Sequence, residues 1–253
     1  MNSLTARALI AGGSGGIGRA IAVGLAQAGW DIALTYRNNK DAGVETADLV
    51  RAAGRDASIH GVDLTDATAA REVVSGIGAE APLGAVVYAA GPHIPMQFIS
   101  ELSPETFSDT IDQDLKACFN LLQPALPFLR PTKGSVLAIV TPVISRYTRK
   151  DIMSVTPKAA IQALIRGIAA EEGRYGVRAN AIGVGVIEGQ GMWDELIARG
   201  DFTEAGLKQA LADTALKRFG DVEDVANAAT FLLSERSSWI TGQTLYVDGG
   251  YSV

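Results

Sequence analysis

The run from Gly12 to Gly18 restricts the fold more than any other part of the chain. It reads Gly-Gly-Ser-Gly-Gly-Ile-Gly and separates a short apolar stretch from a segment with helical periodicity. Three of its glycines form G-x-x-x-G-x-G, a variant of the dinucleotide fingerprint, in which glycine permits a tight turn and a close backbone approach to a pyrophosphate. The N-terminus of the following helix would offer free N–H groups to phosphate oxygens. The predicted cofactor contacts in this run are Gly12, Ser14, Gly16, Ile17 and Gly18.

Apolar runs of strand length alternate with longer segments of helical period. The expected strands lie near Ala8–Ala11, Asp31–Tyr36, Ser58–Val62, Ala85–Ala89, Ser135–Val140, Arg178–Ile182 and Thr244–Val247. The expected helices are Ile17–Ala28, Lys40–Ala53, Asp66–Ile77, Pro104–Leu129, Pro157–Tyr175 and Val222–Leu233. Strands that are apolar on both faces are typical of a parallel sheet covered by helices, and the alternation implies right-handed βαβ units. We therefore predict one α/β domain over residues 1–253, a doubly wound Rossmann fold with a seven-stranded parallel sheet and helices on both faces.

The composition argues against several classes of protein. The 253 residues include 22 Lys+Arg and 28 Asp+Glu, a formal charge of −6, and 47% are hydrophobic, which is typical of a globular chain. The acidic balance argues against a nucleic-acid partner, and two histidines with one cysteine argue against a metal site. No apolar run reaches the roughly 18 residues of a membrane helix, residues 1–7 lack a signal-peptide pattern, and Cys118 has no disulfide partner. We expect a cytoplasmic protein with no membrane partner.

The segment Gly183–Ala215 departs from the strict alternation. It inserts two helical patterns, Met192–Ala198 and Thr203–Ala212, between the last two expected strands. Open α/β sheets bind ligands at the carboxyl ends of their strands, which is where this insertion begins. We predict a substrate lid over about residues 188–215, with a plain surface hairpin of helices as the alternative.

The end of the second strand bears on the choice of cofactor. An acidic residue there would bind the adenosine ribose 2′-hydroxyl and favour NAD. This chain has Tyr36-Arg37-Asn38 instead, and the Arg37 guanidinium can pair with a 2′-phosphate. The sequence therefore favours NADP(H).

Taken together, these motifs resemble the short-chain dehydrogenase/reductase superfamily, and 3-oxoacyl-carrier-protein reductases most of all. Residues 11–18 match the family's T-G-x-x-x-G-x-G with alanine in place of threonine, and residues 88–91 stand at N-N-A-G with both asparagines lost. The tail from Arg218 through Asp248-Gly249-Gly250 also matches closely. The resemblance implies an adenine contact at Asp63 and Leu64, and contacts on the nicotinamide side at Ala89, Gly91, Lys158, Gly185 and Ile187. It also implies a homotetramer, with interface material at 115–122, 164–168, Trp239 and Tyr251.

The family's catalytic pattern is met only in part. The resemblance implies a Tyr-x-x-x-Lys pair, a serine thirteen residues before the tyrosine, and an asparagine on an earlier helix. Lys158 stands at the lysine position, and the other three positions hold Ser154, Thr141 and Asp114. Threonine keeps a hydroxyl, but serine in place of tyrosine removes a phenol with a pKa of about 10, and with it the usual proton donor.

Four replacements for that phenol are open. Tyr147 could enter the site from the loop 145–149, Asp114 could be held protonated by an apolar pocket, or Lys158 or a water on Ser154 could deliver the proton. The fourth is a different reaction, because the family's dienoyl-CoA reductases also carry Ser-x-x-x-Lys. Their tyrosine position, fifteen before Lys158, holds Val143, and the enoyl-reductase tyrosine position, seven before it, holds Asp151.

The start of the catalytic helix offers a further source of hydrogen bonds. Thr156 is a good N-cap and Pro157 a good first residue, so we expect the helix to begin near 154–156 with Ser154 at its mouth. Its free N–H groups could then face a substrate carbonyl, although a proline that merely starts a helix is the simpler interpretation.

The sequence thus predicts an NADP(H)-dependent oxidoreductase that reduces the carbonyl of an acyl thioester or related ketone. The alternatives are a C=C reductase of enoyl or dienoyl thioesters, or a catalytically weak NADP(H)-binding subunit in a mixed oligomer with an active homologue. The expected substrate is a small molecule, carried on coenzyme A or acyl carrier protein if the basic residues Arg146, Arg149 and Lys150 bind its phosphates or acidic surface. The expected cleft lining is apolar, namely 94–96, 142–144, Met192, Trp193, Leu196 and Phe202.

Overall fold

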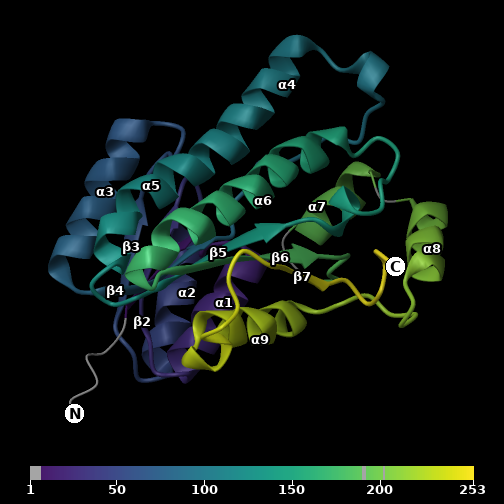
Figure 1. The fold of residues 1–253 in the computed structure, drawn as a ribbon. Helices are drawn as coiled ribbons and strands as arrows, with labels where there is room; N and C mark the ends of the chain where they lie inside the picture. The colour runs from purple at the N-terminus through teal and green to yellow at the C-terminus, as the bar shows by residue number, and fades with distance from the viewer. Residues whose placement is uncertain (1–6, 190–191, 202) are drawn as a thin grey trace.

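A seven-stranded parallel sheet forms the centre of the molecule in a computed structural model that describes residues 7–189, 192–201 and 203–253 (Figure 1). The strands are β1 (Arg7–Ala11), β2 (Asp31–Tyr36), β3 (Ala57–Gly61), β4 (Leu83–Tyr88), β5 (Ser135–Val140), β6 (Arg178–Val184) and β7 (Thr244–Val247). Each begins and ends within two residues of its predicted bounds. Their order in the sheet is β3-β2-β1-β4-β5-β6-β7, which confirms the doubly wound fold.

The order of the strands fixes where a ligand can bind. β1 pairs with β2 on one side and with β4 on the other, so the direction of winding reverses between β1 and β4. Loops that leave the carboxyl ends of these two strands diverge to opposite faces and open a crevice. The glycine-rich run follows β1 directly, and residues 89–91 follow β4 directly.

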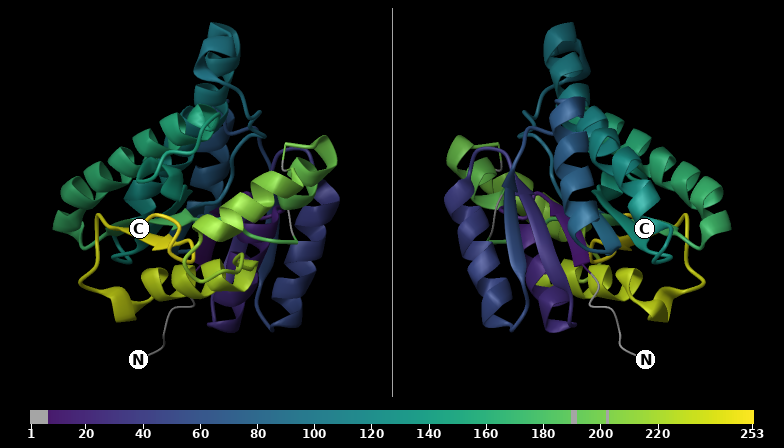
Figure 2. Two further views of the ribbon diagram at one scale, coloured as in Figure 1. Left: turned by 90° about the vertical axis from the view of Figure 1, so that its right-hand side faces the viewer. Right: turned by 90° about the vertical axis from the view of Figure 1, so that its left-hand side faces the viewer.

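Helices cover both faces of the sheet, as predicted (Figures 1 and 2). One layer holds α1 (Gly16–Gln27), α2 (Lys40–Ala52) and α9 (Val222–Leu233), and its core includes Ile10 and Leu34. The other layer holds α3 (Ala67–Glu80), α5 (Ala117–Leu129) and α6 (Ile152–Glu172), and its core includes Leu9 and Tyr88. Leu9 and Ile10 lie on opposite faces because successive strand side chains alternate, so both faces must be apolar.

The helix predicted over Pro104–Leu129 is interrupted near its middle. α4 (Pro104–Ile111) and α5 are joined by a π-helical turn, η2 (Asp112–Lys116). A π-turn inserts one residue into the helical repeat and rotates the side chains that follow, and such turns are frequent at functional sites. It places Asp114, which is completely buried, against the start of α6.

The start predicted for α6 is wrong by several residues. The helix begins at Ile152, so Ser154 lies inside its first turn, Thr156 is not the N-cap, and Pro157 is an interior residue. The Asp151 carbonyl accepts the N–H groups of Ser154 and Val155 at 3.1 and 3.0 Å. Burial of Met153, worth about 1.5–3 kcal/mol, offsets part of the roughly 3 kcal/mol that an interior proline costs.

The insertion before β7 forms two helices, α7 (Met192–Arg199) and α8 (Glu204–Asp213), as the sequence pattern predicted. Figure 1 shows α8 at one side of the molecule, next to the end of the chain. The remaining short helices are η1 (Ile99–Glu101), η3 (Pro142–Ile144), η4 (Gly173–Tyr175) and η5 (Glu235–Ser237). Within the part of the chain that is described, no helix is long and apolar enough to cross a membrane.

Candidate active site

The glycine-rich turn has the geometry that a pyrophosphate requires. Gly12 has a φ of +79°, and a Cβ atom there would lie 2.6 Å from the Ala89 carbonyl oxygen. A Cβ at Gly18 would lie 2.2 Å from the Gly12 oxygen, so only glycine lets α1 pack this closely on the turn. α1 has Gly15 as its N-cap and no capping side chain, and its N-terminal N–H groups therefore remain available to an anion.

Two predicted adenosine contacts lie at neighbouring strand ends. Arg37 follows β2, is exposed, and donates a long hydrogen bond of 3.5 Å to the side chain of Gln113. Asp63 lies beyond β3, where Thr65 donates its N–H and its hydroxyl to the carboxylate, each at 2.9 Å. These two hydrogen bonds, with a lesser effect of Arg37, hold the pKa of Asp63 below its usual value. Leu64 is buried behind Asp63.

A buried polar cluster lies where β4, η2 and α6 meet. The Lys158 ammonium donates to Oδ1 of Asp114 at 2.9 Å and to the Ala90 carbonyl at 3.3 Å. The Tyr88 hydroxyl donates to the Asp114 carbonyl oxygen at 2.9 Å and to its Oδ1 at 3.0 Å. Gly91 borders this cluster, since a Cβ atom there would lie 3.5 Å from the Lys158 Nζ. The predicted residues Asp114, Lys158 and Gly91 are therefore brought together.

Tyr88 is a member of this cluster that the sequence did not indicate as functional. It is completely buried, and burial, together with the charge of Asp114, raises the pKa of its hydroxyl well above 10. Tyr88 therefore acts as a hydrogen-bond donor to Asp114. Asp114 accepts hydrogen bonds from Tyr88 and Lys158. It therefore serves as a counter-ion that positions the lysine. Its second oxygen, Oδ2, is buried without a hydrogen-bond partner.

Ser154 and Thr141 are both partly buried and lie on elements that flank the cluster. Ser154 lies in the first turn of α6, one helical turn before Lys158. Thr141 follows β5, and its hydroxyl accepts the Val143 N–H at 3.3 Å, which starts η3. Both hydroxyls thus occur at the carboxyl edge of the sheet, on the same side as the glycine-rich turn.

The loop that carries Tyr147 is held in place by hydrogen bonds from the residues on either side of Tyr147. Arg146 donates to the Tyr251 carbonyl at 2.9 Å and to the Asp213 carboxylate at 3.1 Å, while Ser145 and Thr148 hydrogen-bond to the hydroxyls of Tyr246 and Tyr251. Tyr147 itself is 50% exposed. The Arg146 side chain therefore joins the loop to α8 and to the C-terminal segment. Of the three basic residues predicted to bind a carrier, only Arg149 and Lys150 are left for that role.

Asp151, at the start of the helix that carries Ser154 and Lys158, is a titratable residue to which the sequence gave no role. It precedes α6 and stands seven residues before Lys158. Burial raises the pKa of its carboxyl from 3.8 to about 7, and no charged neighbour contributes to that shift. The spacing between Asp151 and Lys158 is visible in the sequence. The burial that raises the pKa of Asp151 is not.

The residues predicted to border the nicotinamide and to line the substrate cleft are mostly apolar where the structure describes them. Gly185 donates its N–H to the Val247 carbonyl at 3.0 Å, and Ile187 forms a β-bridge with Gly220. Ile94, Pro142 and Leu196 are buried, and the Trp193 ring packs on Phe219 with centroids 5.3 Å apart. The predicted lining residue Phe202 and the side chain of Met192 lie outside the described part of the structure.

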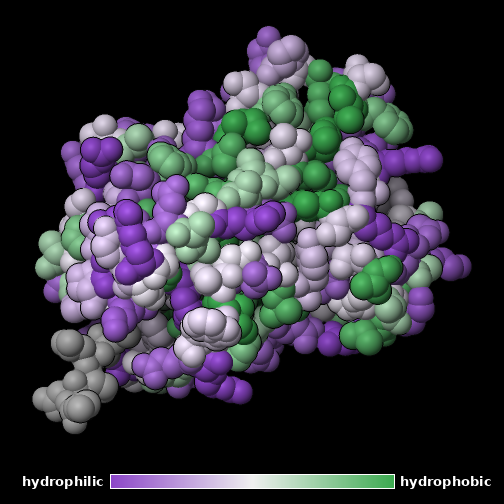
Figure 3. All heavy atoms as spheres, in the orientation of Figure 1, coloured by the Kyte–Doolittle hydropathy of each residue, from purple (hydrophilic) through white to green (hydrophobic). Residues whose placement is uncertain are grey.

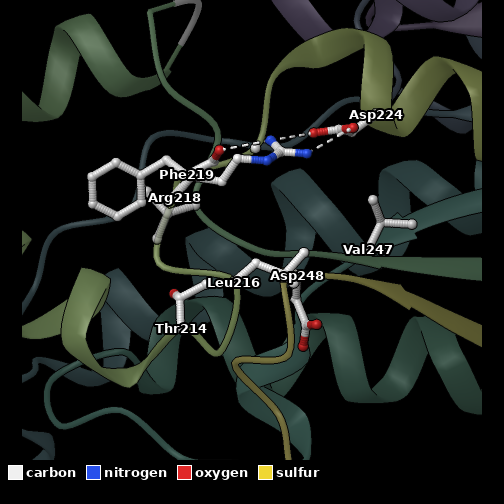
Figure 4. Close-up of a pocket in the computed structure, with 10 residues that line it drawn as sticks. Thr214, Leu216, Arg218, Phe219, Asp224, Val247 and Asp248 are labelled. Carbon is white, nitrogen blue, oxygen red and sulfur yellow. Dashed lines mark hydrogen bonds and ion pairs between the residues drawn. The ribbon is translucent and has the colours of Figure 1, made fainter.

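A small pocket lies between the segment after α8 and the end of β7 (Figure 4). Its volume of about 30 Å³ is close to that of one water molecule. Arg218 and Asp224, at 2.9 Å, line it, with Leu216, Phe219 and Asp248. None of the predicted catalytic residues borders it, so we attribute it to packing of the C-terminal segment. No group of three or more His, Cys, Asp or Glu side chains capable of holding a metal ion occurs among the described residues.

Comparisons with known proteins agree with this architecture. The family model described as enoyl-(acyl carrier protein) reductase matches residues 11–252. A short-chain type dehydrogenase/reductase from Mycobacterium ulcerans superposes with a TM-score of 0.90 at 29% identity, covering 99% of this chain and 91% of that one. The 3-oxoacyl-[acyl-carrier-protein] reductase of Staphylococcus aureus is 31% identical over 252 residues, 98% of each chain.

The chain belongs to the short-chain dehydrogenase/reductase family. Relatives within that family differ in their reactions, since the gluconate 5-dehydrogenase of Gluconobacter oxydans is also 32% identical, over 98% of this chain and 95% of its own. Membership in the short-chain dehydrogenase/reductase family makes this chain an oxidoreductase of the class that uses nicotinamide cofactors. The choice of substrate depends on the groups around Lys158.

Proposed function

We propose that the protein is an NADP(H)-dependent reductase of the carbonyl group of an acyl thioester or a related ketone. The observation that carries the proposal is the fixed position of Lys158, which Asp114 and the Ala90 carbonyl hold beside Gly91, at the strand ends that border the glycine-rich turn. A cation in that position can bind the ribose next to the nicotinamide and orient the ring above the crevice.

The residues present fit a dinucleotide. Gly12 and Gly18 leave a cradle that any Cβ atom would fill, and the uncapped start of α1 suits the pyrophosphate. Gly91, Gly185 and Ile187 would border the nicotinamide. When bound, the cofactor would supply a hydride to the substrate. Lys158 would hold the ribose, and the hydroxyls of Thr141 and Ser154 would hydrogen-bond the substrate oxygen on which negative charge develops.

The phosphorylated form of the cofactor is favoured by Arg37. Its guanidinium is exposed at the end of β2, and its hydrogen bond to Gln113 is long enough to give way to a 2′-phosphate. Asp63 lies nearby, but its carboxylate is occupied by Thr65. The local charge therefore suits NADP(H) better than NAD(H).

An acyl thioester is favoured by the apolar lining and by the names of the relatives. Buried Ile94, Pro142 and Leu196 suit an acyl chain, while the exposed Arg149 and Lys150 suit the phosphates of coenzyme A or an acidic carrier protein. The Staphylococcus aureus relative is a 3-oxoacyl-[acyl-carrier-protein] reductase, which acts on such a carbonyl by its name.

Reduction of a conjugated C=C bond is the second candidate. Two observations favour it: the matching family model is described as an enoyl-(acyl carrier protein) reductase, and Ser154 stands four residues before Lys158, the Ser-x-x-x-Lys spacing that dienoyl-CoA reductases also have. A hydride added to an enoyl thioester produces an enolate, which needs a proton donor in a different place from that of an alkoxide.

We also propose that the protein assembles as a tetramer through two exposed apolar surfaces. Leu115, Phe119 and Leu164 line a hollow of about 460 Å³ on the α4–α6 side, where Figure 3 shows hydrophobic side chains gathered. Trp239, which is 98% exposed, marks a second surface. Leu122 and Ile165, within the predicted interface ranges, belong to the protomer core, and that part of the prediction is wrong.

The test is NADPH oxidation by the purified protein with 3-oxoacyl, enoyl and dienoyl thioesters, each with coenzyme A and with a short pantetheine carrier. We expect turnover with the 3-oxoacyl compounds and little with NADH. Turnover with enoyl or dienoyl compounds alone would establish the second candidate. Turnover with neither, recovered by Ser154→Tyr, would indicate a nucleotide-binding subunit.

A further inference from the structure

The backbone at Asp151 places this residue in line with the catalytic groups of α6. Its carbonyl accepts the N–H of Ser154 at 3.1 Å and of Val155 at 3.0 Å, so the helical repeat already includes Asp151. Residues spaced by three, four and seven positions share one face of an α-helix. Asp151, Ser154 and Lys158 therefore form one stripe, and Lys158 at its far end contacts the Asp114 and Ala90 groups of the site.

The carboxyl of Asp151 is not used to cap its helix. Aspartate at the N-cap usually accepts a backbone N–H from the first turn. Asp66 does so for α3, accepting Thr68 and Ala69 at 2.8 and 3.1 Å, and Asp221 does so for α9, accepting Asp224 at 2.8 Å. Asp151 forms no such bond. A structural role as a helix cap therefore does not explain this residue.

Partial burial without a partner favours the protonated form of the Asp151 carboxyl. Asp151 is partly buried, and the described residues provide it with neither an ion pair nor a side-chain hydrogen bond. Loss of solvent around a carboxylate that has no partner disfavours its charged form, and this raises the pKa of Asp151 to about 7. A protonated carboxyl beside a reacting carbonyl can donate its proton, as carboxyls with raised pKa values do in other enzymes.

The backbone just before Asp151 is strained and fixed from a second loop. Lys150 has a φ of +72°, in the left-handed region that residues other than glycine seldom adopt. Its carbonyl accepts the Gln97 N–H at 3.1 Å, and its ammonium lies 4.7 Å from the centroid of the Phe98 ring. The loop after Gly91 thus fixes the backbone turn at Lys150, which precedes Asp151. Backbone strain of this kind concentrates at functional sites.

We infer that Asp151 is the general acid of this enzyme, supplying the proton that the phenol supplies in relatives with tyrosine. The inference rests on the proposed reductase function. As the hydride reaches the carbonyl carbon, the π electrons of the C=O bond move to oxygen, the O–H bond of Asp151 breaks, and a new O–H bond forms on the alcohol product. The cofactor is oxidised, the carbonyl is reduced, and the Asp151 carboxylate regains its proton from water.

The other candidate acids are less suited to this step. Asp114 is completely buried, and its Oδ1 already accepts from Tyr88 and Lys158. Tyr147 is half exposed on a loop whose neighbours are fastened to the C-terminal segment. Asp151 lies three residues from Ser154 on the same helix face, so the serine can hydrogen-bond the same oxygen that Asp151 protonates.

The test compares Asp151→Asn and Asp151→Glu with the native enzyme and with Asp221→Asn, an N-cap variant of α9. We expect Asp151→Asn to lower kcat by about 10²–10⁴-fold at pH 6.5, as loss of a general acid does, with the NADPH Kd unchanged. Asp151→Glu keeps the acid and should retain part of the activity and the folded state even if the asparagine variant unfolds. Asp221→Asn should leave kcat unaltered.

The pH profile separates a proton donor from a structural residue. Native kcat should fall about tenfold per pH unit above pH 7, because the acid must be protonated, and Asp151→Asn should lack that fall. A loss below about tenfold in folded Asp151→Asn, or the same alkaline fall in that variant, would overturn the inference while the reductase function stood. Absence of native turnover on every thioester and ketone would instead overturn the proposed function and the inference with it.

Discussion

The Lys158 ammonium lies 2.9 Å from Oδ1 of Asp114, and the Asp114 side chain is completely buried. The pair joins the π-turn η2 to α6 and fixes the lysine beside Gly91. Tyr88 donates a hydrogen bond to the same carboxylate oxygen. The site is therefore organised around a buried acceptor that holds a cation in place before any ligand arrives.

Removal of the Asp114 carboxylate should destabilise the fold. We expect Asp114→Leu to lower the free energy of unfolding by about 3–5 kcal/mol, because it leaves the Lys158 ammonium without its counter-ion and removes one of the two acceptors of the Tyr88 hydroxyl. The matched control is Asp112→Leu, two residues earlier, whose carboxylate pairs with Lys116 at 2.5 Å on the surface. That change should cost at most about 1 kcal/mol. Urea unfolding measures both, and equal costs would contradict the positioning role.

The cofactor preference should depend on Arg37. Arg37→Asp is expected to lower the affinity for NADPH by about tenfold or more and to raise that for NADH, since it replaces the partner of a 2′-phosphate with one for a 2′-hydroxyl. Fluorescence titration with each nucleotide measures the ratio. Arg71→Asp, an equally exposed change on α3, is the control. An unchanged ratio of the two Kd values would remove the NADP(H) assignment.

Asp151→Asn should stabilise the protein at alkaline pH. The folded pKa of about 7 exceeds the ordinary value of 3.8, so the native carboxyl binds a proton that the unfolded chain releases between these values. Native stability is therefore lost as the pH rises from 3.8 to about 7, by up to about 4 kcal/mol for three pKa units, and asparagine avoids that loss. Denaturation at pH 4 and pH 8 should show the gain at pH 8 only. Equal stability at pH 8 would indicate that the carboxyl is solvated.

The Glu172–Arg130 pair should show the opposite dependence on pH. Arg130 donates two hydrogen bonds to Glu172, at 2.8 and 2.9 Å, and thereby lowers the pKa of that carboxyl. Because the pKa of Glu172 is lower in the folded protein, the pair stabilises the fold above the ordinary pKa of 4.5. This stability is lost as the pH falls from 4.5 through the folded pKa. Glu172→Gln should therefore cost about 1–3 kcal/mol at pH 7 and progressively less toward pH 3. A cost that does not change with pH would argue against the ion pair.

The fold followed from the sequence because its strongest signals are local. The strand β1, the glycine-rich turn and α1 are contiguous, and the fully apolar strands reveal a sheet buried on both faces. The start of α6 could not be predicted from the sequence. Pro157 is a strong local signal for a helix start, whereas the burial of Met153, which favours an earlier start, depends on tertiary packing. The π-turn at Asp114 was missed for a similar reason, because the periodicity of 104–129 is compatible with one continuous helix.

The site was predictable where residue type alone decides the chemistry. Gly12 and Gly18 are identified by their lack of a Cβ atom and Arg37 and Lys158 by their charge, and the structure brings Lys158 together with Asp114 and Gly91. The chemistry of Asp151 depends on burial and on an unused capping position, and neither is visible in a linear sequence. Tyr88 likewise gains its role from the strand end that carries it to Asp114.

Hydride tracing would test the proposed reaction most directly. The native protein would be incubated with a 3-oxoacyl thioester and NADPH deuterated at the hydride-donating carbon, and the product analysed by mass spectrometry. We predict a 3-hydroxyacyl thioester with one deuterium on the carbon that bears the new hydroxyl. The absence of that product, together with deuterium on the β-carbon of a saturated thioester when an enoyl thioester is supplied, would contradict carbonyl reduction as the function of this protein.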